Sequence, residues 1–446
     1  MRSAAVGFAT VMVMDVHEAL ADVGVRVPDV LLPTTDLRSW AVVACDQFTS
    51  QPEYWQQVEQ VVGEAPSTLR LIFPEVYLEQ PDPDARIAAI NKAMTHYLNA
   101  GLFVRHAQTM VLVRRETRQG VVRWGLIVAL DLEQYSWEPD ARTLIRATEG
   151  TILDRLPPRV RIREAAALEL PHIMVLISDA ERAVIEPLTA ATPRLTRLYD
   201  TELMLDGGRV TGWAVDGAAD LEAVTDGLRA LRADLDPANP LLFAMGDGNH
   251  SFATAKSIWN DLRERLTPAE RDGHPARYCL VELENIYDPG LDFEPIHRVL
   301  FGIDRAAFEA AMADQCASMQ RIEVTDVDTA LGAIDGAAEQ SFGYIDADGI
   351  AVYRLAVPTA SLAAGTLQRV IDELTRTGDV AVDYIHGADV TEGLARAENN
   401  VGLLLPPVPK DSFFASIVSD GALPRKTFSL GEAQDKRYYL EARRIR

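Results

Sequence analysis

The amino-acid sequence predicts a mixed α/β protein, in which short strands alternate with amphipathic helices. Short apolar runs recur along the 446-residue chain between stretches whose apolar residues follow helical spacing. One run, 240–245, leads through a glycine-containing turn into a long helical pattern over 249–265. Hydrophobic residues make up 48% of the chain and charged residues 24%, which is ordinary for a globular protein and predicts a buried core.

The elements before residue 180 follow from period and punctuation. Strands are expected over 41–45, 70–77 and 172–177, with a hairpin formed by 110–113 and 121–132 around the turn at 118–120. Helices are expected over 52–64, with proline in the first turn, over 82–100, with Gly101 after the last turn, and from Asp179 onward.

The remaining elements continue the same alternation. Helices are expected over 220–233, 249–265 and near 367–375, and strands over 240–245, 277–284, 342–345, 351–355, 380–385 and 401–405. From this order we expect a fold built of several regions. They are an N-terminal tail and first helix (1–30), an α/β region (31–236), a core region around the turn (237–304) and a C-terminal α/β region with a basic tail (305–446).

The composition excludes several classes of function. There are 43 basic against 66 acidic residues, a net charge of −23, which disfavours nucleic acid and anionic membranes as partners. No stretch approaches the ~20 apolar residues of a membrane-spanning helix. Three widely spaced cysteines favour a reducing, cytoplasmic location. The apolar run near the N-terminus is too short for a signal peptide, and Met12 or Met14 is an alternative start.

Several common catalytic motifs are missing from the sequence. It contains no GxxxxGK[ST] loop, no complete GxGxxG, no HExxH and no CxxC. P-loop ATPases, typical dinucleotide-binding dehydrogenases and zinc-dependent proteases are therefore disfavoured.

The most informative segment is the turn Gly246-Asp247-Gly248-Asn249-His250-Ser251, between the predicted strand and helix. Glycines allow backbone amides to approach a ligand, and a helix N-terminus offers unpaired N–H groups to a phosphate. Asp247 adds a base or a cation ligand, and His250 a group that can be charged near neutral pH. The alternative is an ordinary α/β turn in which Asn249 or Ser251 caps the helix.

A second polar cluster follows the predicted strand 41–45. Asp46 stands where a catalytic carboxylate at a strand end would stand; the alternative is that it caps the next helix. Cys45 is expected to be a buried apolar residue, and His172 a core histidine. Two further features can present cations to an anionic ligand or merely form surface ion pairs. They are an arginine-rich segment (Arg142, Arg146, Arg155, Arg159, Arg161 and Arg163) and the basic tail from Leu423, with Lys426, Thr427 and Lys436.

These motifs together resemble the bacterial and archaeal family known as domain of unknown function 1015. The matching pieces are the segment 40–55, the segment with Arg146, Glu149 and Thr151, the turn 246–250, the segment 288–291 with His297 and Arg298, and the segment 424–428. The family usually carries Asp-Gly-His-His-Arg in the turn, whereas this chain has Asn249 and Ser251 at the first histidine and the arginine. The turn is also similar to that of the ParB/sulfiredoxin superfamily, which binds nucleotide phosphates and includes kinases of free L-serine.

The resemblance and the residues together suggest a small-molecule phosphotransferase. We hypothesise that it uses ATP or ADP with Mg²⁺, and that L-serine is the leading acceptor. The turn 246–251, with Lys426 and Thr427, would hold the phosphates, Asp247 would hold the metal, and His250 and Lys426 would stabilise charge on the transferred group. Asp46 would be the base, and Arg146, Glu149, Thr151, His297 and Arg298 would bind the acceptor.

Two other readings remain open from the sequence. One is a hydrolase of phosphate esters or nucleotides that uses the same turn. The other is a ParB-like regulator that binds a nucleotide without fast turnover. A homodimer is one assembly that the sequence leaves open.

Overall fold

The computed structural model describes residues 15–78, 82–376 and 378–446. The alternative starts at Met12 and Met14, with most of the predicted N-terminal tail, lie outside the described residues. Within the described parts of the chain, no helix combines the length and the apolar character needed to cross a bilayer.

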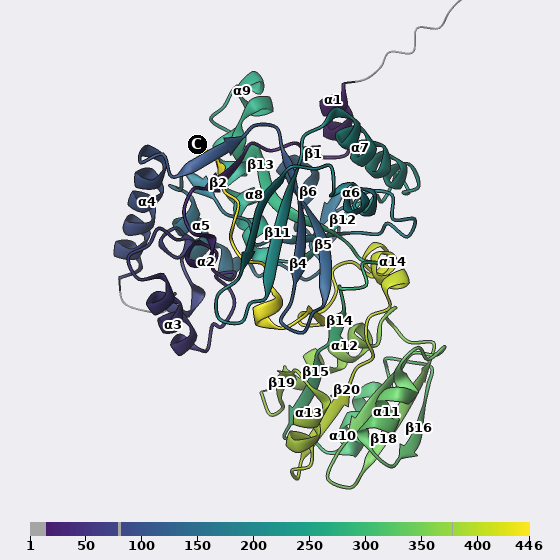
Figure 1. The fold of residues 1–446 in the computed structure, drawn as a ribbon. Coiled ribbons are helices and arrows are strands. Elements are labelled where there is room, and N and C mark those ends of the chain that lie inside the picture. The colour runs from purple at the N-terminus through teal and green to yellow at the C-terminus, as the bar shows by residue number, and fades with distance from the viewer. Residues whose placement is uncertain (1–14, 79–81, 377) are drawn as a thin grey trace, which may run out of the picture.

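A large mixed sheet forms the centre of the protein (Figure 1). Its strands lie in the order β10-β11-β4-β5-β13-β9-β12-β7-β6, and β1 pairs with β5. Most neighbours are antiparallel, but β12–β7, β13–β9 and β6–β7 are parallel. The strands are β1 (Val25–Arg26), β4 (Met110–Glu116), β5 (Val122–Asp131), β6 (Tyr135–Ser136), β7 (Ile145–Arg146), β9 (Met174–Ile177), β10 (Arg197–Glu202), β11 (Arg209–Val215), β12 (Phe243–Asp247) and β13 (Tyr278–Asn285).

Both faces of this sheet are buried, which explains its continuous apolar runs. In β5, Leu126 and Val128 pack into the core on one face, while Ile127 packs into the core on the other. The helices of the larger body are α1 (Val16–Asp22), α2 (Leu37–Trp40), α3 (Pro52–Val62), α4 (Pro83–Asn99), α5 (Leu156–Arg163), α6 (Glu186–Ala191), α7 (Ala218–Ala233), α8 (Asn249–Arg263) and α9 (Pro268–Gly273).

A smaller sheet forms a separate lobe below the large one in Figure 1. Its strands lie in the order β16-β18-β17-β20-β15-β19, and its core centres on Phe308, Phe342 and Leu367. The strands are β15 (His297–Phe301), β16 (Ser318–Val324), β17 (Ser341–Ile345), β18 (Ile350–Ala356), β19 (Ala381–Ile385) and β20 (Asn400–Leu404). The helices are α10 (Arg305–Met312), α11 (Val327–Ile334), α12 (Ala363–Thr375) and α13 (Ala388–Ala395).

The basic tail, residues 423–446, follows α14 (Lys410–Asp420) and returns to the larger body (Figure 1). Its strand β21 (Phe428–Leu430) pairs with β14 (Phe293–Pro295), and β22 (Arg443–Arg444) pairs with β8 (Leu168–Glu169). The tail is buried by charge pairing as well as by apolar contact. Arg437, with 3% of its side chain exposed, forms ion pairs with Glu282 and Glu441.

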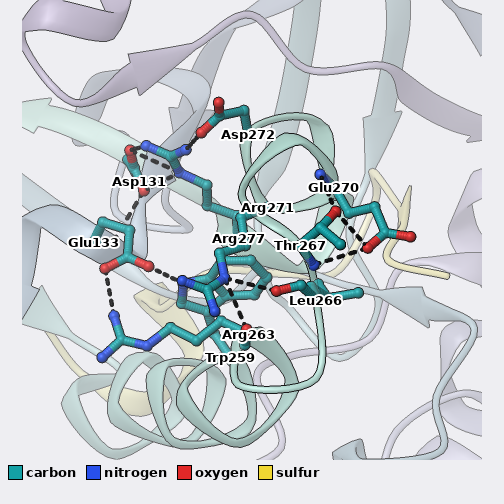
Figure 2. Close-up of polar contacts among 10 residues, drawn as sticks. All are labelled: Asp131, Glu133, Trp259, Arg263, Leu266, Thr267, Glu270, Arg271, Asp272 and Arg277. Atoms are coloured by element: carbon teal, nitrogen blue, oxygen red, sulfur yellow. Dashed lines mark hydrogen bonds and ion pairs between the residues drawn. The ribbon is translucent and has the colours of Figure 1, made fainter.

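The C-terminal end of α8 is anchored by a polar cluster (Figure 2). Glu133 accepts hydrogen bonds from Trp259 Nε1 at 2.7 Å and from Arg263 Nη1 at 2.6 Å. Arg277 binds both carboxylate oxygens of Asp131, and Arg271 Nε donates to the carbonyl of Arg263 at 2.8 Å. These contacts hold the C-terminal end of α8 against the segments 131–133 and 271–277.

Most expected elements are present within a few residues, but three expectations are wrong. Residues 41–45 are extended and form only one bridge, Val43 to Tyr438. The stretch 70–77 holds the short 3₁₀ turns Thr68–Arg70 and Glu75–Tyr77 in place of a strand, because Pro74 has no N–H for a ladder. No helix starts at Asp179; its carboxylate accepts from the Val184 amide, and α6 begins only at Glu186.

Candidate active site

The strand–turn–helix unit forms as expected, and packing explains its glycines. Strand β12 runs through Gly246 to Asp247, and Gly248, with φ of 74°, precedes the first turn of α8. A Cβ on Gly248 would lie 3.0 Å from Ile173 Cα, and one on Gly246 would lie 2.9 Å from Leu430 Cδ1. At residue 248 the left-handed backbone and the approach of Ile173 favour glycine, whereas at residue 246 the nearest neighbour is the flexible end of the Leu430 side chain.

The N-terminus of α8 opens into a cavity of about 920 Å³, a volume that suits a small-molecule site. Its walls come from the segment after residue 45, from the segment 148–159, from the turn and from the basic tail. The polar lining side chains are Asp46, Gln47, Thr49, Glu75, Thr148, Glu149, Asp154, Arg155, Arg159, Asp247, Asn249, His250, Ser251, Lys426, Ser429 and Lys436.

Asp247 lies beside a lysine that the tail contributes. Its Oδ1 accepts from the Gly248 amide at 2.9 Å, and its Oδ2 lies 3.3 Å from Lys436 Nζ. Only 10% of the Lys436 side chain is exposed, so this cation is held in place at the cavity wall. Lys436 Nζ also lies 3.5 Å from Ser429 Oγ.

Asp46 lies in the same cavity, as the sequence predicts. Its Oδ1 accepts from Gln47 Nε2 at 3.1 Å, and its Oδ2 lies 3.9 Å from His172 Nε2. Nearby, Glu75 and Arg159 form an ion pair at 2.5 Å. Burial raises the pKa of Glu75 despite this arginine, and the negative charge of Asp46 raises it further.

His250 lines the cavity as a neutral ring, whereas the sequence also allows a charged one. Burial and the nearby Arg159 and Arg155 lower its pKa from 6.5 to about 4, so the ring is neutral near pH 7. Its Nε2 accepts from the Ile152 amide at 3.3 Å. The single ring N–H therefore lies at Nδ1, and His250 can act only as a neutral donor there.

Glu149 connects the turn to the tail. Its carboxylate accepts from the Lys426 amide at 2.9 Å, and Asn249 Nδ2 donates to its carbonyl at 3.1 Å. Burial raises the pKa of Glu149. Lys426 adopts φ of 55°, and its Nζ lies 5.7 Å from the centre of the Tyr384 ring.

Five predicted site residues do not line this cavity. Thr151 and Thr427 have local roles: Thr151 Oγ1 lies 3.4 Å from Asn249 Nδ2, and Thr427 Oγ1 donates to the Pro424 carbonyl. Arg146 donates to the carbonyls of residues 143, 239 and 240. These bonds hold the loop near residue 240 in place, and the role of Arg146 in substrate binding stays a prediction.

His297 and Arg298 lie behind the wall, in strand β15 of the smaller lobe. Burial and the adjacent Arg298 lower the pKa of His297 to about 4, and its Nδ1 accepts from the Leu405 amide. Arg298 is fully buried and stacks on Tyr384, with its guanidinium carbon 4.9 Å from the ring centre. Both are buried and neither lines this cavity, so their role in acceptor binding stays a prediction.

Other cavity residues were not among the predicted site residues. Arg155 and Arg159 belong to the arginine-rich segment, and Lys436 to the basic tail, so charge alone indicated them. Glu75 and Ser429 carry no comparable signal, since an isolated glutamate or serine is common on any surface. Two other arginines of the segment form ion pairs elsewhere: Arg161 with Asp84, and Arg163 with Glu169.

The donor set allows a magnesium ion only in a limited way. Among the described residues, no three His, Cys, Asp or Glu side chains are arranged as a metal cluster. Mg²⁺ in phosphoryl-transfer sites contacts one or two carboxylates and takes its other ligands from phosphates and water. Asp247 fits such a single contact, in exchange for its contact with Lys436.

Comparisons with solved structures give only distant similarities. A free serine kinase in complex with ADP is 10% identical, with a TM-score of 0.38, over 72% of this chain and 92% of that one. A conserved hypothetical protein from Pyrococcus furiosus is 10% identical, with a TM-score of 0.36, over 70% and 93%. C-terminally truncated SbnI from Staphylococcus aureus is 10% identical, with a TM-score of 0.35, over 69% and 82%.

These scores are too low to transfer a residue role, and the site rests on its own geometry. No curated protein sequence matches this chain at a significant level. A family model described as protein of unknown function (DUF1015) matches residues 28–375, which is more than half of the chain. The resemblance inferred from the sequence motifs is thereby confirmed, and the chain belongs to the DUF1015 family.

Proposed function

We propose that this protein is a phosphotransferase that moves a phosphoryl group from a nucleotide to the hydroxyl of a small amino-acid-like acceptor. The observation that carries this proposal is the composition of one cavity. It combines a helix N-terminus and four cations, which suit phosphates, with the Asp46 carboxylate, which suits a hydroxyl group. Among the described residues no hydrogen bond is recorded to Asp46 Oδ2, and His172 Nε2 lies 3.9 Å from it.

The donor phosphates would bind at the start of α8. The amides of the first helical turn lack intrahelical partners and carry the positive end of the helix dipole. Lys436 and Lys426 would supply positive charge, and the neutral His250 would donate through Nδ1. When bound, Mg²⁺ would neutralise phosphate charge next to Asp247.

The acceptor would bind on the Asp46 side of the cavity. If the acceptor is an amino acid, Arg155 would bind its carboxylate. Arg155 lines the cavity, and Arg146 does not. Glu149 would bind the ammonium group, whose positive charge would favour the ionised form of this buried carboxyl. L-serine is the leading acceptor because of the family resemblance.

The chemical step balances with these groups alone. The acceptor oxygen forms a bond to the terminal phosphorus, and the bond between that phosphorus and its bridging oxygen breaks. Asp46 takes the proton of the acceptor hydroxyl through Oδ2. ATP would leave as ADP, and ADP would leave as AMP. Positioning and electrostatic stabilisation supply most of the acceleration in such reactions.

The test is phosphate transfer by the purified protein with Mg²⁺. ATP and ADP are offered against a panel of amino acids that includes L-serine, and products are identified by mass spectrometry. We expect one phosphorylated acceptor. Asp46→Asn should lower turnover about 100-fold or more while nucleotide affinity is retained. The control is Asp261→Asn, which alters an exposed carboxylate of α8 outside the cavity.

The possible outcomes separate the three candidate functions. Acceptor-dependent loss of the donor supports the kinase. Donor loss without any acceptor indicates a hydrolase, and nucleotide binding without turnover indicates a regulator. Full turnover in both Asp46→Asn and Asp247→Asn would overturn the assignment of the site.

A further inference from the structure

Three side chains behind the cavity form a continuous chain of hydrogen bonds. Tyr439 comes from the tail, His172 precedes β9, and Ser251 lies in the first turn of α8. The Tyr439 hydroxyl accepts from the Cys45 amide at 3.1 Å and lies 2.9 Å from His172 Nδ1. His172 Nε2 lies 2.9 Å from Ser251 Oγ.

The strength of the available acceptors favours one position for each hydrogen atom in this chain. The Cys45 amide can only donate, so the Tyr439 oxygen accepts there. The Tyr439 side chain is fully buried, which raises the pKa of its phenol well above the usual value, so its own O–H is retained. The Cys45 side chain also lies near that hydroxyl, but its sulfur is a weak acceptor, and the imidazole nitrogen His172 Nδ1, at 2.9 Å, is the stronger one. Tyr439 therefore donates to Nδ1, and His172 carries its hydrogen at Nε2.

This assignment determines the role of the Ser251 hydroxyl. His172 Nε2–H donates to Ser251 Oγ, because Asp46 Oδ2, at 3.9 Å, is beyond hydrogen-bond distance. Ser251 Oγ accepts that bond and keeps its own hydrogen for another partner. Within the described part of the chain no acceptor is recorded for this hydrogen, and Ser251 lines the cavity. The hydroxyl is thus left as a donor toward a ligand.

We propose that Ser251 donates a hydrogen bond to a phosphoryl oxygen of the ligand at the start of α8, and that His172 and Tyr439 are positioning residues that hold it in this role. This inference rests on the proposed function. It also gives the site a chemical selectivity. A ligand oxygen without a hydrogen, as in a phosphate, can accept the hydrogen bond from Ser251. An amine that faces Ser251 would place its own N–H against the Ser251 O–H, and no hydrogen bond could form.

The same geometry keeps Asp46 available for the acceptor. Because the Nε2 hydrogen is taken by Ser251, it does not neutralise Asp46 Oδ2. The network therefore separates two tasks across one imidazole ring: Ser251 faces the donor phosphates, and Asp46 faces the acceptor hydroxyl.

The first measurement is the tautomer of His172, which does not depend on activity. Protein labelled with ¹⁵N-histidine is examined by NMR, and His172→Gln identifies the signal. We expect a protonated Nε2 and an unprotonated Nδ1 in the unaltered protein. In Tyr439→Phe, which removes the donor to Nδ1, the Nδ1 signal should shift. A hydrogen on Nδ1 in the unaltered protein would overturn the inference.

The second measurement is the affinity for ADP by calorimetry. Ser251→Ala should weaken binding about tenfold or more, the effect of one hydrogen bond to a charged group. Ser251→Thr, which retains the hydroxyl, should restore most of the affinity. Ser257→Ala is the matched control, because it removes a hydroxyl from the same helix outside the cavity.

The outcomes distinguish the two proposals. Equal ADP binding by Ser251→Ala and the unaltered protein would overturn the role of Ser251 and leave the proposed function standing. Failure of the unaltered protein to bind ADP would overturn the proposed function, and with it any phosphate contact of Ser251. The tautomer of His172 would still be decided by NMR alone.

Discussion

Replacing Gly248 with alanine should destabilise the protein through two separable effects. The first is backbone strain, because φ of 74° is a left-handed conformation that costs an L-residue about 1–2 kcal/mol. The second is crowding, because the new Cβ would lie 3.0 Å from Ile173 Cα and also 3.0 Å from Ile173 Cγ1. A backbone atom cannot rotate away, so β9 or the turn must shift, at about 1–3 kcal/mol.

Gly101 provides a matched control for this prediction. It adopts φ of 68°, and a Cβ there would meet nothing within 4 Å, so Gly101→Ala carries the strain without the crowding. Urea denaturation should show a loss of about 1–2 kcal/mol in Gly101→Ala and of about 2–5 kcal/mol in Gly248→Ala. ADP affinity should fall only in Gly248→Ala. An equal loss of stability in the two variants would refute the claim that Ile173 crowds a side chain at residue 248.

Three further predictions concern charge. Burial raises the pKa of Glu284 from 4.5 to about 8, so the folded state retains a proton that the unfolded state releases. The stability of the protein should therefore fall as pH rises from about 4.5 to 8. In thermal denaturation, Glu284→Gln should flatten this decline. The pH dependence due to His250 has the opposite sign, because its pKa is about 4 in the folded state and 6.5 ordinarily. Stability should therefore be lost as pH falls from 6.5 to about 4. The melting temperature of His250→Gln should fall less over this pH range than that of the unaltered protein. Lys436→Met should weaken ADP binding about tenfold or more, measured by calorimetry. Lys92→Met, which alters an exposed residue of α4, should leave ADP binding unchanged. Equal affinities of the two variants for ADP would show that Lys436 does not belong to the phosphate site.

Local patterns were sufficient to predict the strand–turn–helix unit. The apolar run before Asp247, the glycines and the helical spacing after Asn249 all lie within one short segment. For the same reason the hairpin β4–β5 and helix α4, with its Asp82 cap and Gly101, could be predicted. In each case, the residues that determine the element are neighbours in sequence.

The expectations that are wrong depend on distant partners. The extended run 41–45 has its hydrogen-bond partners at Arg437 and Tyr439, almost four hundred residues later, and these are backbone groups that leave no trace in side-chain patterning. Arg146 carries a charge that suits a ligand, but its recorded partners include carbonyl groups of a loop near residue 240. A sequence shows which side chains carry charge and does not show which backbone atoms will satisfy them.

The cavity itself could be predicted only in part. Asp46, Asp247 and Ser251 were indicated by their positions beside expected strand ends and turns. Glu75 and Ser429 were not, because each reaches the cavity through tertiary packing. The neutral state of His250 also required the structure, since it depends on burial and on two arginines about a hundred residues away.

The basic tail has a consequence for how the protein matures during translation. Lys426, Ser429 and Lys436 are synthesised after the other walls of the cavity. The tail that carries them pairs with segments near residues 43, 169 and 294. A nascent chain can form the large sheet and the smaller lobe while its cavity still lacks the lysine beside Asp247. The wall that holds the lysine beside Asp247 therefore forms only when the tail has paired with the body, after the other walls have been synthesised.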